Sequence, residues 1–225
     1  MSGPRVVVAI DGPGGSGKST VARAVAAALD LEHLDTGAMY RAVTLEATRR
    51  GVPSDDEAAL AALADALDSV VAVRVLVDGD DVTEEIRGED VNAKVSIVAA
   101  NPGVRTSLVR RQRAWVAERG AGVVEGRDIA SVVLPDADVK VYLTATEAER
   151  ARRRAEEQGL VGSPDSLAAA QGSITARDLL DSTRTVSPLI VANGAVVIDS
   201  TGRSPASVIA EILELARGAD DDGAR

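Results

Sequence analysis

Apolar and polar residues follow one another in blocks that predict alternating strands and helices. Short apolar runs, typical of strands buried on both faces of a parallel sheet, occupy residues 5–10, 122–124, 139–143 and 195–198. Apolar residues at helical spacing follow or separate these runs, over residues 19–29, 104–119, 146–158 and 204–217. Four buried strands alternating with helices predict an α/β fold with a parallel sheet and right-handed crossovers.

Residues 54–83 depart from this alternation of buried strands and helices. Valines alternate along one face of residues 71–77, Asp78-Gly79 follows as a hairpin-turn signal, and a second polar strand comes after it. We expect a small antiparallel ribbon inserted into the α/β chain. Before it, residues 54–67 predict an alanine-rich helix opened by a cap at Ser54-Asp55-Asp56-Glu57. Residues 158–164 predict a loop directly after an arginine-dense helix.

Composition narrows the possible functions. The chain has 225 residues, which suits one well-buried domain or one domain with a small insertion. It has no cysteine and one histidine, His33, which excludes disulfides and makes a histidine-clustered metal centre improbable. The net charge of −10 argues against a protein that grips a nucleic-acid backbone. Because no apolar segment has the length of a signal peptide or a membrane span, we expect a cytoplasmic protein.

One motif carries specific chemistry. Residues 12–19, Gly-Pro-Gly-Gly-Ser-Gly-Lys-Ser, satisfy G-x-x-x-x-G-K-[ST] between a predicted buried strand and a predicted helix. Glycines let backbone N–H groups turn inward around a phosphate, and the helix N-terminus favours the same anion. We expect Lys18 to reach the β- and γ-phosphates of ATP and the Ser19 hydroxyl to bind Mg²⁺. The predicted nucleotide-binding residues are Gly12, Pro13, Gly14, Gly15, Ser16, Gly17, Lys18, Ser19 and Thr20.

Arginines beyond this P-loop favour a small-molecule kinase over other nucleotide-binding classes. A GTPase would show N-K-x-D, whereas the nearest string, residues 92–95, ends in valine. A kinase needs a second anion site, for which the planar fork of arginine is suited. Arginines occur beside acids or turns at four places, namely residues 35–41, 101–105, 126–128 and 177–184. Residues 177, 181 and 184 share one face of a predicted helix.

These strings resemble the bacterial-type cytidylate kinases, within the P-loop nucleoside monophosphate kinases. The likeness runs in order over residues 6–217, and its most specific parts are Asp-Thr-Gly-Ala-Met-Tyr-Arg at 35–41 and Gly-Arg-Asp at 126–128. The resemblance implies a single kinase unit over residues 1–225. Within it, residues 36–100 would form the monophosphate-binding region, with a β insert near 69–90, and residues 150–175 a helical lid.

The resemblance also implies roles for individual residues. Arg41, Arg127 and Arg177 would hold the CMP phosphate, Asp181 the sugar hydroxyls, and Ser96, Arg105 and Asp128 the cytosine edge. The implied acceptor-binding set is Thr36, Arg41, Ser96, Arg105, Arg127, Asp128, Arg177, Asp181 and Arg184. The implied catalytic set is Lys18, Arg127, Asp128, Arg177 and Arg184. Leu180 stands where some relatives carry an arginine, so one or two arginines of the cluster at 150–154 are candidates to supply that charge.

The implied reaction is transfer of the γ-phosphoryl group of ATP to CMP or dCMP, with Mg²⁺, in a monomer that binds neither nucleic acid nor membrane. A kinase for another small acceptor, such as UMP or shikimate, and a nucleotide-binding regulator without turnover are the alternatives. The distribution of charge agrees with two anionic substrates. Residues 51–90 hold 12 acids and two bases, whereas residues 91–154 hold 12 bases and seven acids, so the acidity lies around the insert and away from the predicted site.

Overall fold

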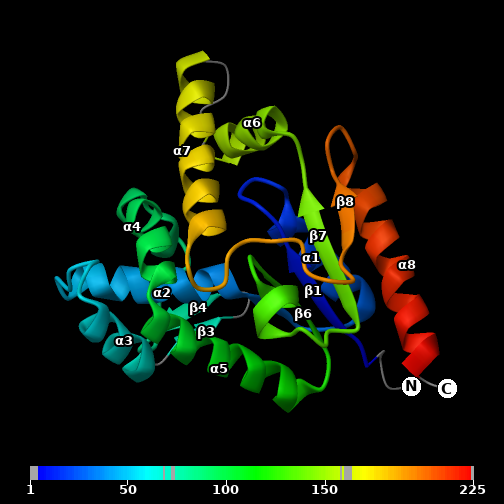
Figure 1. Ribbon diagram of the computed structural model, residues 1–225, viewed down its shortest axis with the longest axis horizontal. Helices are drawn as coiled ribbons and strands as arrows, with labels where there is room; N and C mark the ends of the chain where they lie inside the picture. Colours follow the sequence, from blue (N-terminus) through cyan, green and yellow to red (C-terminus); the bar gives the residue numbers. More distant parts are fainter. Residues whose placement is uncertain (1–4, 68, 72–73, 158, 160–163, 224–225) are drawn as a thin grey trace. The chain divides into compact units, whose positions relative to one another are not determined.

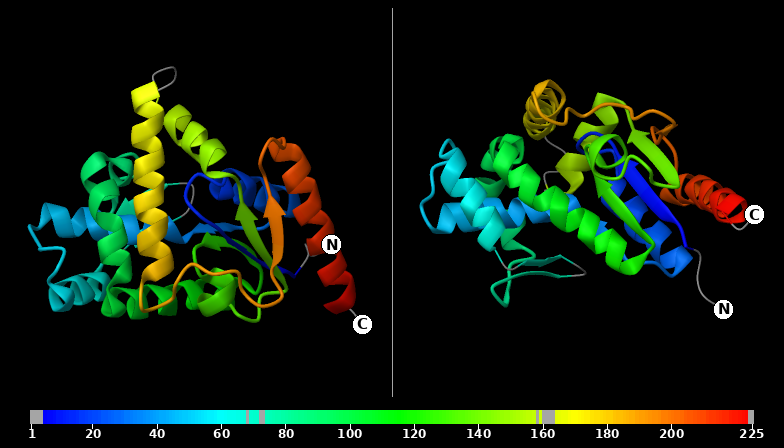
Figure 2. Two further views of the ribbon diagram at one scale, coloured as in Figure 1. Left: turned by 45° about the horizontal axis from the view of Figure 1, so that its top comes forward. Right: turned by 60° about the horizontal axis from the view of Figure 1, so that its bottom comes forward.

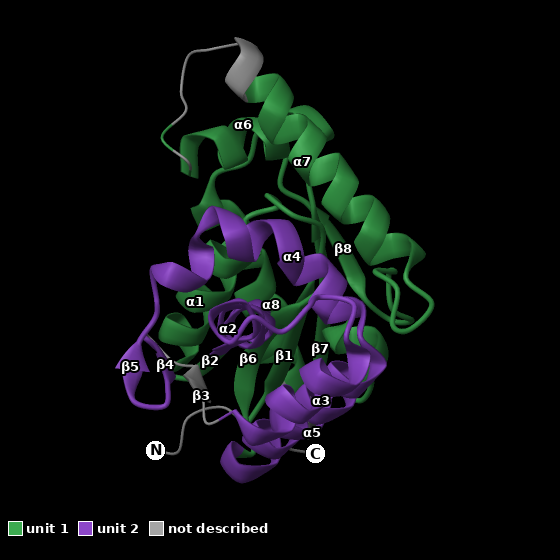
Figure 3. Cartoon of the chain, turned by 90° about the vertical axis from the view of Figure 1, so that its left-hand side faces the viewer, with its two compact units in different colours: residues 1–33, 120–225 green, residues 34–119 purple. Residues whose placement is uncertain are grey.

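The computed structural model describes the whole chain except residues 1–4, 68, 72–73, 158, 160–163 and 224–225. The chain divides into two compact units, drawn in different colours in Figure 3. Unit 1 consists of residues 1–33 and 120–225, and unit 2 of residues 34–119. The chain therefore leaves unit 1 after its first helix and returns to it for the remaining strands.

A parallel sheet forms the centre of unit 1. Its long strands are β1 (Val7–Asp11), β6 (Gly122–Gly126) and β7 (Val139–Thr144), with β1 paired in parallel to both of the others. The strand order is β2-β6-β1-β7-β8, which confirms the predicted α/β class. Strand β2 (His33–Asp35) was not expected, because its three residues include one apolar side chain and give no periodic signal.

Strand β8 (Val196–Asp199) forms as predicted, but the expectation that both its faces are buried is wrong. It lies at the edge of the sheet, paired in parallel with β7. Val197 is 54% exposed, and only Ile198 is fully buried. An apolar run of four residues does not show whether a strand lies at the centre or at the edge of its sheet.

Two helices cover one face of this sheet, α1 (Lys18–Leu29) and α8 (Pro205–Gly223). Val21 and Val25 of α1, together with Val208 and Ile212 of α8, pack with the strand side chains in one apolar core. Figure 2 shows both helices beside the strands. Because apolar residues recur on one face of each helix, the sequence alone placed both helices, although α8 continues beyond the predicted end at residue 217.

Helices α6 (Glu147–Glu157) and α7 (Pro164–Thr183) pack against each other at the carboxyl end of β7 (Figure 1). Both overlap residues 150–175, the segment predicted as a helical lid, and α7 continues beyond it to Thr183. The predicted loop at 158–164 lies mostly outside the described residues. Among the residues that the structure describes, no helix is both long and apolar enough to cross a membrane.

Unit 2 contains the helices α2 (Thr36–Arg49), α3 (Glu57–Ala66), α4 (Glu89–Ala100) and α5 (Pro102–Arg119), and the short 3₁₀ turn η1 (Glu85–Arg87). Helix α3 begins three residues later than predicted, because Asp56 is its cap and accepts a hydrogen bond from the Ala59 N–H at 3.0 Å. Asn101 caps α5 by accepting from the N–H groups of Gly103 and Val104. Polar residues before α3 and α5 thus satisfy N–H groups that these helices leave unpaired.

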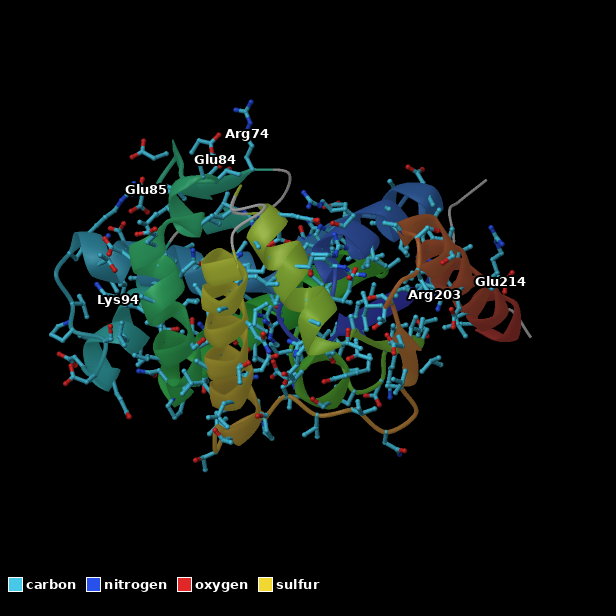
Figure 4. The ribbon with its side chains drawn as sticks, turned by 90° about the horizontal axis from the view of Figure 1, so that it is seen from above. Arg74, Glu84, Glu85, Lys94, Arg203 and Glu214 are labelled. Carbon is cyan, nitrogen blue, oxygen red and sulfur yellow. The ribbon has the colours of Figure 1, made fainter. Side chains whose placement is uncertain are left out.

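The predicted insert is present in unit 2 as a three-stranded antiparallel sheet of β3 (Ser69–Val71), β4 (Val75–Val77) and β5 (Asp80–Asp81). Asp78 and Gly79 have φ values of 50° and 91°, as a tight hairpin turn requires. Val75 and Val77 are buried, while Figure 4 shows Arg74, Glu84 and Glu85 pointing outward from this part of the chain. The acidic segment therefore has an apolar inner face and a charged outer one.

Candidate functional site

The P-loop joins β1 to α1 in unit 1 and has the geometry of an anion cradle. Gly12, Gly15 and Gly17 have φ values of 152°, 71° and 90°, which residues with a side chain rarely adopt. A Cβ on Gly12 would lie 2.0 Å from the carbonyl oxygen of Leu143, so only glycine fits there. Lys18 Nζ folds back over the loop and donates to the carbonyl oxygen of Pro13 at 2.7 Å. The loop is therefore formed, with Lys18 folded over it.

The predicted metal ligand, Ser19, belongs to a chain of polar side chains that the sequence did not reveal. Its hydroxyl donates to Glu125 Oε2 at 2.9 Å, and Glu125 Oε1 lies 3.0 Å from His33 Nε2. Glu125 is 3% exposed and sits near the carboxyl end of β6. Oxygen donors such as a hydroxyl and a carboxylate are those that Mg²⁺ prefers. The arrangement is chemically suited to Mg²⁺ held jointly with the phosphates of ATP.

Asp11, the last residue of β1, is a second buried acid at this edge of the sheet. Its two carboxylate oxygens accept from the N–H groups of Ile129 and Ala130, each at 2.8 Å. Burial raises the pKa of Asp11 from 3.8 to about 6, although these hydrogen bonds act in the opposite direction. Since Arg127 and Asp128 directly precede the bonded residues, Asp11 fixes the loop that carries both.

Three predicted acceptor-binding residues meet in unit 1. Arg127 Nε donates to Asp181 Oδ2 at 2.8 Å, and its Nη1 donates to the carbonyl oxygen of Gly12 at 2.9 Å. Arg177 Nε lies 3.9 Å from the same oxygen of Asp181, one helical turn away on α7, and has no hydrogen-bond partner among the described residues. One carboxylate thus faces two guanidinium groups beside the P-loop.

Lys18, Arg127 and Arg177 form a cluster of buried cations that lie close enough to act on one another's charge. Burial and, next in size, the charge of Arg127 lower the pKa of Lys18 from 10.5 to about 7. Burial and the charge of Arg127 likewise lower the pKa of Arg177 to about 10. Burial would raise the pKa of Asp181, but Arg127 and Arg177 together hold it below its usual value. A bound anion would relieve the repulsion among these cations.

Asp128 and Arg184 form a second ion pair in unit 1. Arg184 Nη2 lies 3.3 Å from Asp128 Oδ1, and each side chain is 6% exposed. Arg184 also donates through Nε to the carbonyl oxygen of Ser187. Helix α7 ends at Thr183, so Arg184 follows the helix directly instead of lying within it as the sequence pattern suggested.

The four arginines of α6, at positions 150 and 152–154, differ in whether they contact the P-loop. Arg150 donates to the carbonyl oxygen of Gly14 at 3.1 Å, and Arg153 donates to that of Ser16 at 3.1 Å. Arg152 and Arg154 instead pair with glutamates of their own helix. The structure therefore brings two of the four cluster arginines to the P-loop. Leu180, the position without an arginine, is 52% exposed.

The remaining predicted acceptor residues lie in unit 2. Thr36 is the buried first residue of α2, following the cap Asp35, whose carboxylate accepts from the Ala38 N–H at 3.0 Å. Arg41 of α2 donates to the carbonyl oxygen of Ile86 at 2.9 Å. Arg105 of α5 is buried, with its guanidinium carbon 5.7 Å from the centre of the Tyr40 ring. Ser96 is a half-buried residue of α4, which packs against α2.

The other predicted nucleotide-binding residues are placed by the loop and the first turn of α1. Pro13 and Ser16 are buried, Gly14 is half-buried, and Thr20 is exposed. Across the described residues, no group of three or more histidines, cysteines, aspartates or glutamates could hold a metal ion by itself.

Sequence reasoning missed Asp11, Glu125 and Asp178 as members of this site. The first two carry a usable signal, since each is an acid near the carboxyl end of an apolar strand.

Comparison with known proteins gives one consistent result. The family described as cytidylate kinase matches residues 8–218. A cytidylate kinase of Mycobacterium leprae (strain Br4923) is 47% identical over 219 residues, covering 94% of this chain and 96% of its own. One of Rhodococcus jostii (strain RHA1) is 48% identical over 218 residues, covering 95% of each chain. The crystal structure of an uncharacterized protein from Eubacterium ventriosum shares the fold, with a TM-score of 0.55 at 12% identity over 95% of this chain and 99% of that one. The chain belongs to the cytidylate kinase family.

Proposed function

We propose that this chain transfers the γ-phosphoryl group of ATP to CMP or dCMP, giving ADP and CDP or dCDP. The observation that carries the assignment of residues is the cluster of three buried cations, Lys18, Arg127 and Arg177, beside a formed P-loop. Two phosphate-bearing substrates would bring negative charge to these cations and relieve their mutual repulsion. Family membership favours cytidylate over UMP or shikimate as the acceptor, and favours an enzyme over a regulator without turnover.

In the proposed reaction, an ionised oxygen of the CMP phosphate attacks the γ-phosphorus in line. The bond from that phosphorus to the β–γ bridging oxygen breaks, and ADP leaves with the electron pair. The acceptor oxygen is already ionised, so the protein needs no general base. Catalysis then consists of positioning and of stabilising charge on the phosphoryl oxygens.

The charged groups beside the P-loop have separate parts in this proposal. Lys18 contacts the β- and γ-phosphates, and Arg177 offers its unpartnered Nε to the CMP phosphate beside Arg127. Asp181 orients both guanidinium groups and holds the sugar hydroxyls. Ser19 would hold Mg²⁺, which when bound neutralises charge on the phosphates. The Ser19 contact with Glu125 supports this role.

Base recognition is assigned to Asp128, Ser96 and Arg105, with Arg184 fixing the Asp128 carboxylate. We also assign Thr36 and Arg41 of unit 2 to acceptor binding, on the family resemblance alone. Hydrogen-bonding groups reject a wrong base strongly, because such a base leaves buried polar atoms unpaired.

We infer a monomer acting in the cytoplasm, where its nucleotide substrates are found. Its net charge of −10 disfavours a nucleic-acid partner.

The test is release of ADP with CMP, dCMP, UMP, AMP and shikimate offered separately. CMP and dCMP should support turnover, and Lys18→Ala should abolish it while the chain stays folded by thermal denaturation. Lys140→Ala, which removes a lysine near the amino end of β7, is the matched control and should keep full turnover. Asp128→Ala should lower kcat/KM for CMP relative to UMP. Wild-type-like turnover in Lys18→Ala would overturn the mechanism, and an unchanged CMP-to-UMP ratio would place the base reader elsewhere.

A further inference from the structure

An internal carboxylate occupies part of the phosphate cradle. The N–H of Gly14 donates to Asp178 Oδ1 at 3.1 Å, although the two residues are 164 positions apart in sequence. Gly14 follows Pro13, whose carbonyl oxygen holds Lys18 Nζ at 2.7 Å. The contact therefore lies at the end of the loop where the lysine is placed, and P-loop lysines reach the β- and γ-phosphates. Asp178 sits where phosphate oxygens are expected.

Arg150 closes a ring of contacts around this carboxylate. Its Nη1 donates to Asp178 Oδ2 and also, at 3.1 Å, to the carbonyl oxygen of Gly14. The Arg150 and Asp178 side chains are 8% and 19% exposed, so their pairing is largely shielded from water. Both oxygens of Asp178 are thus engaged, one by the P-loop and one by the guanidinium of α6. If one member of a shielded ion pair moves away, the other is left as a buried charge without a partner, which is costly.

A second cation, Arg127, lies beside the same contact. A Cβ built on Gly14 would lie 3.7 Å from both Asp178 Oδ1 and Arg127 Nη2, so an acid and a base flank this glycine. Asp178 is one turn before Asp181 on α7, and the charges of both carboxylates act on Arg127. Asp178 therefore offsets part of the positive charge of Arg127 and Arg150 beside the P-loop.

We propose that Asp178 is an internal competitor for the triphosphate of ATP. Its carboxylate accepts the Gly14 N–H in the free chain and must leave when phosphate oxygens arrive, because two negative groups cannot share one donor at hydrogen-bond distance. Departure separates Asp178 from Arg150, which connects filling of the P-loop to the packing of α6 against α7. This inference rests on the proposed function, since it requires that the loop binds ATP.

The test is equilibrium binding of ATP, tripolyphosphate and CMP, each measured separately by calorimetry. Asp178→Asn keeps the side-chain shape and removes the charge, so ATP and tripolyphosphate should bind about fivefold more tightly, as expected from losing one partly exposed charged hydrogen bond. CMP should gain less than twofold, because its proposed contacts do not include the Gly14 N–H. Asp178→Ser, a smaller neutral variant, should shift binding in the same direction.

Asp136→Asn is the matched control. It makes the same change in net charge at an exposed residue just before β7, at the opposite end of that strand from the P-loop, and should leave all three affinities unchanged. Unchanged or weaker ATP binding in both Asp178 variants would overturn the inference. Equal gains for ATP and CMP would also overturn it, by showing a general effect of charge. If the wild type fails to bind ATP, or Lys18→Ala binds it equally well, the proposed function fails instead.

Discussion

Binding of ATP should place a proton on Lys18 at mildly alkaline pH. Burial and the charge of Arg127 hold the pKa of the free Lys18 ammonium at about 7, with Glu125 acting in the opposite direction. At pH 8 only about 0.1 of the free chains then carry this proton. The triphosphate brings negative charge to the ammonium and raises its pKa again, so binding at pH 8 should take up as much as about 0.9 proton.

Calorimetry in buffers of different ionisation enthalpy measures this uptake directly. The slope of the observed binding enthalpy against the buffer ionisation enthalpy equals the number of protons taken up. At pH 8 the phosphates are themselves ionised, because their second pKa is about 6, so they contribute little. Lys18→Arg keeps a permanent positive charge and should reduce the slope to about zero. A wild-type slope near zero, or a Lys18→Arg variant that keeps the wild-type slope, would refute the reasoning.

Two further predictions concern stability. Asp11→Ala leaves the buried N–H groups of Ile129 and Ala130 without their acceptor, so the free energy of unfolding should fall by about 2 kcal/mol in urea denaturation. Because the native pKa of Asp11 is raised to about 6 from 3.8, the folded wild type binds more protons than the unfolded chain in that interval. The difference in the free energy of unfolding between the wild type and Asp11→Ala should therefore grow as pH falls from 7 to 4. A difference that stays constant over this range would contradict the raised pKa. Asn101→Ala removes the cap of α5 and a donor to the Glu57 carbonyl, and should also cost about 2 kcal/mol, whereas the exposed Asp136→Asn should cost almost nothing.

The local sequence pattern was sufficient to predict most of the fold and, within the candidate site, the P-loop. The P-loop was predictable because its glycines, lysine and serine are adjacent in sequence and sit between a buried strand and an amphipathic helix. The β insert was predictable from alternating valines and Asp78-Gly79, since strand burial and hairpin turns depend on neighbouring residues. Strand β2 and the exposure of β8 were not, because a short strand is defined by its partners and its place in the sheet.

The rest of the site exists only through long-range contacts. Asp178 reaches Gly14 across 164 residues and Glu125 reaches Ser19 across 106, and no spacing in the chain encodes either distance. The sequence also offered four neighbouring arginines of α6 without showing which approach the loop. The fold turns Arg150 and Arg153 toward it and leaves Arg152 and Arg154 with their own helix. Sequence determines which charges are present, but only packing decides which of them are buried together, and burial is what lowers the pKa of Lys18.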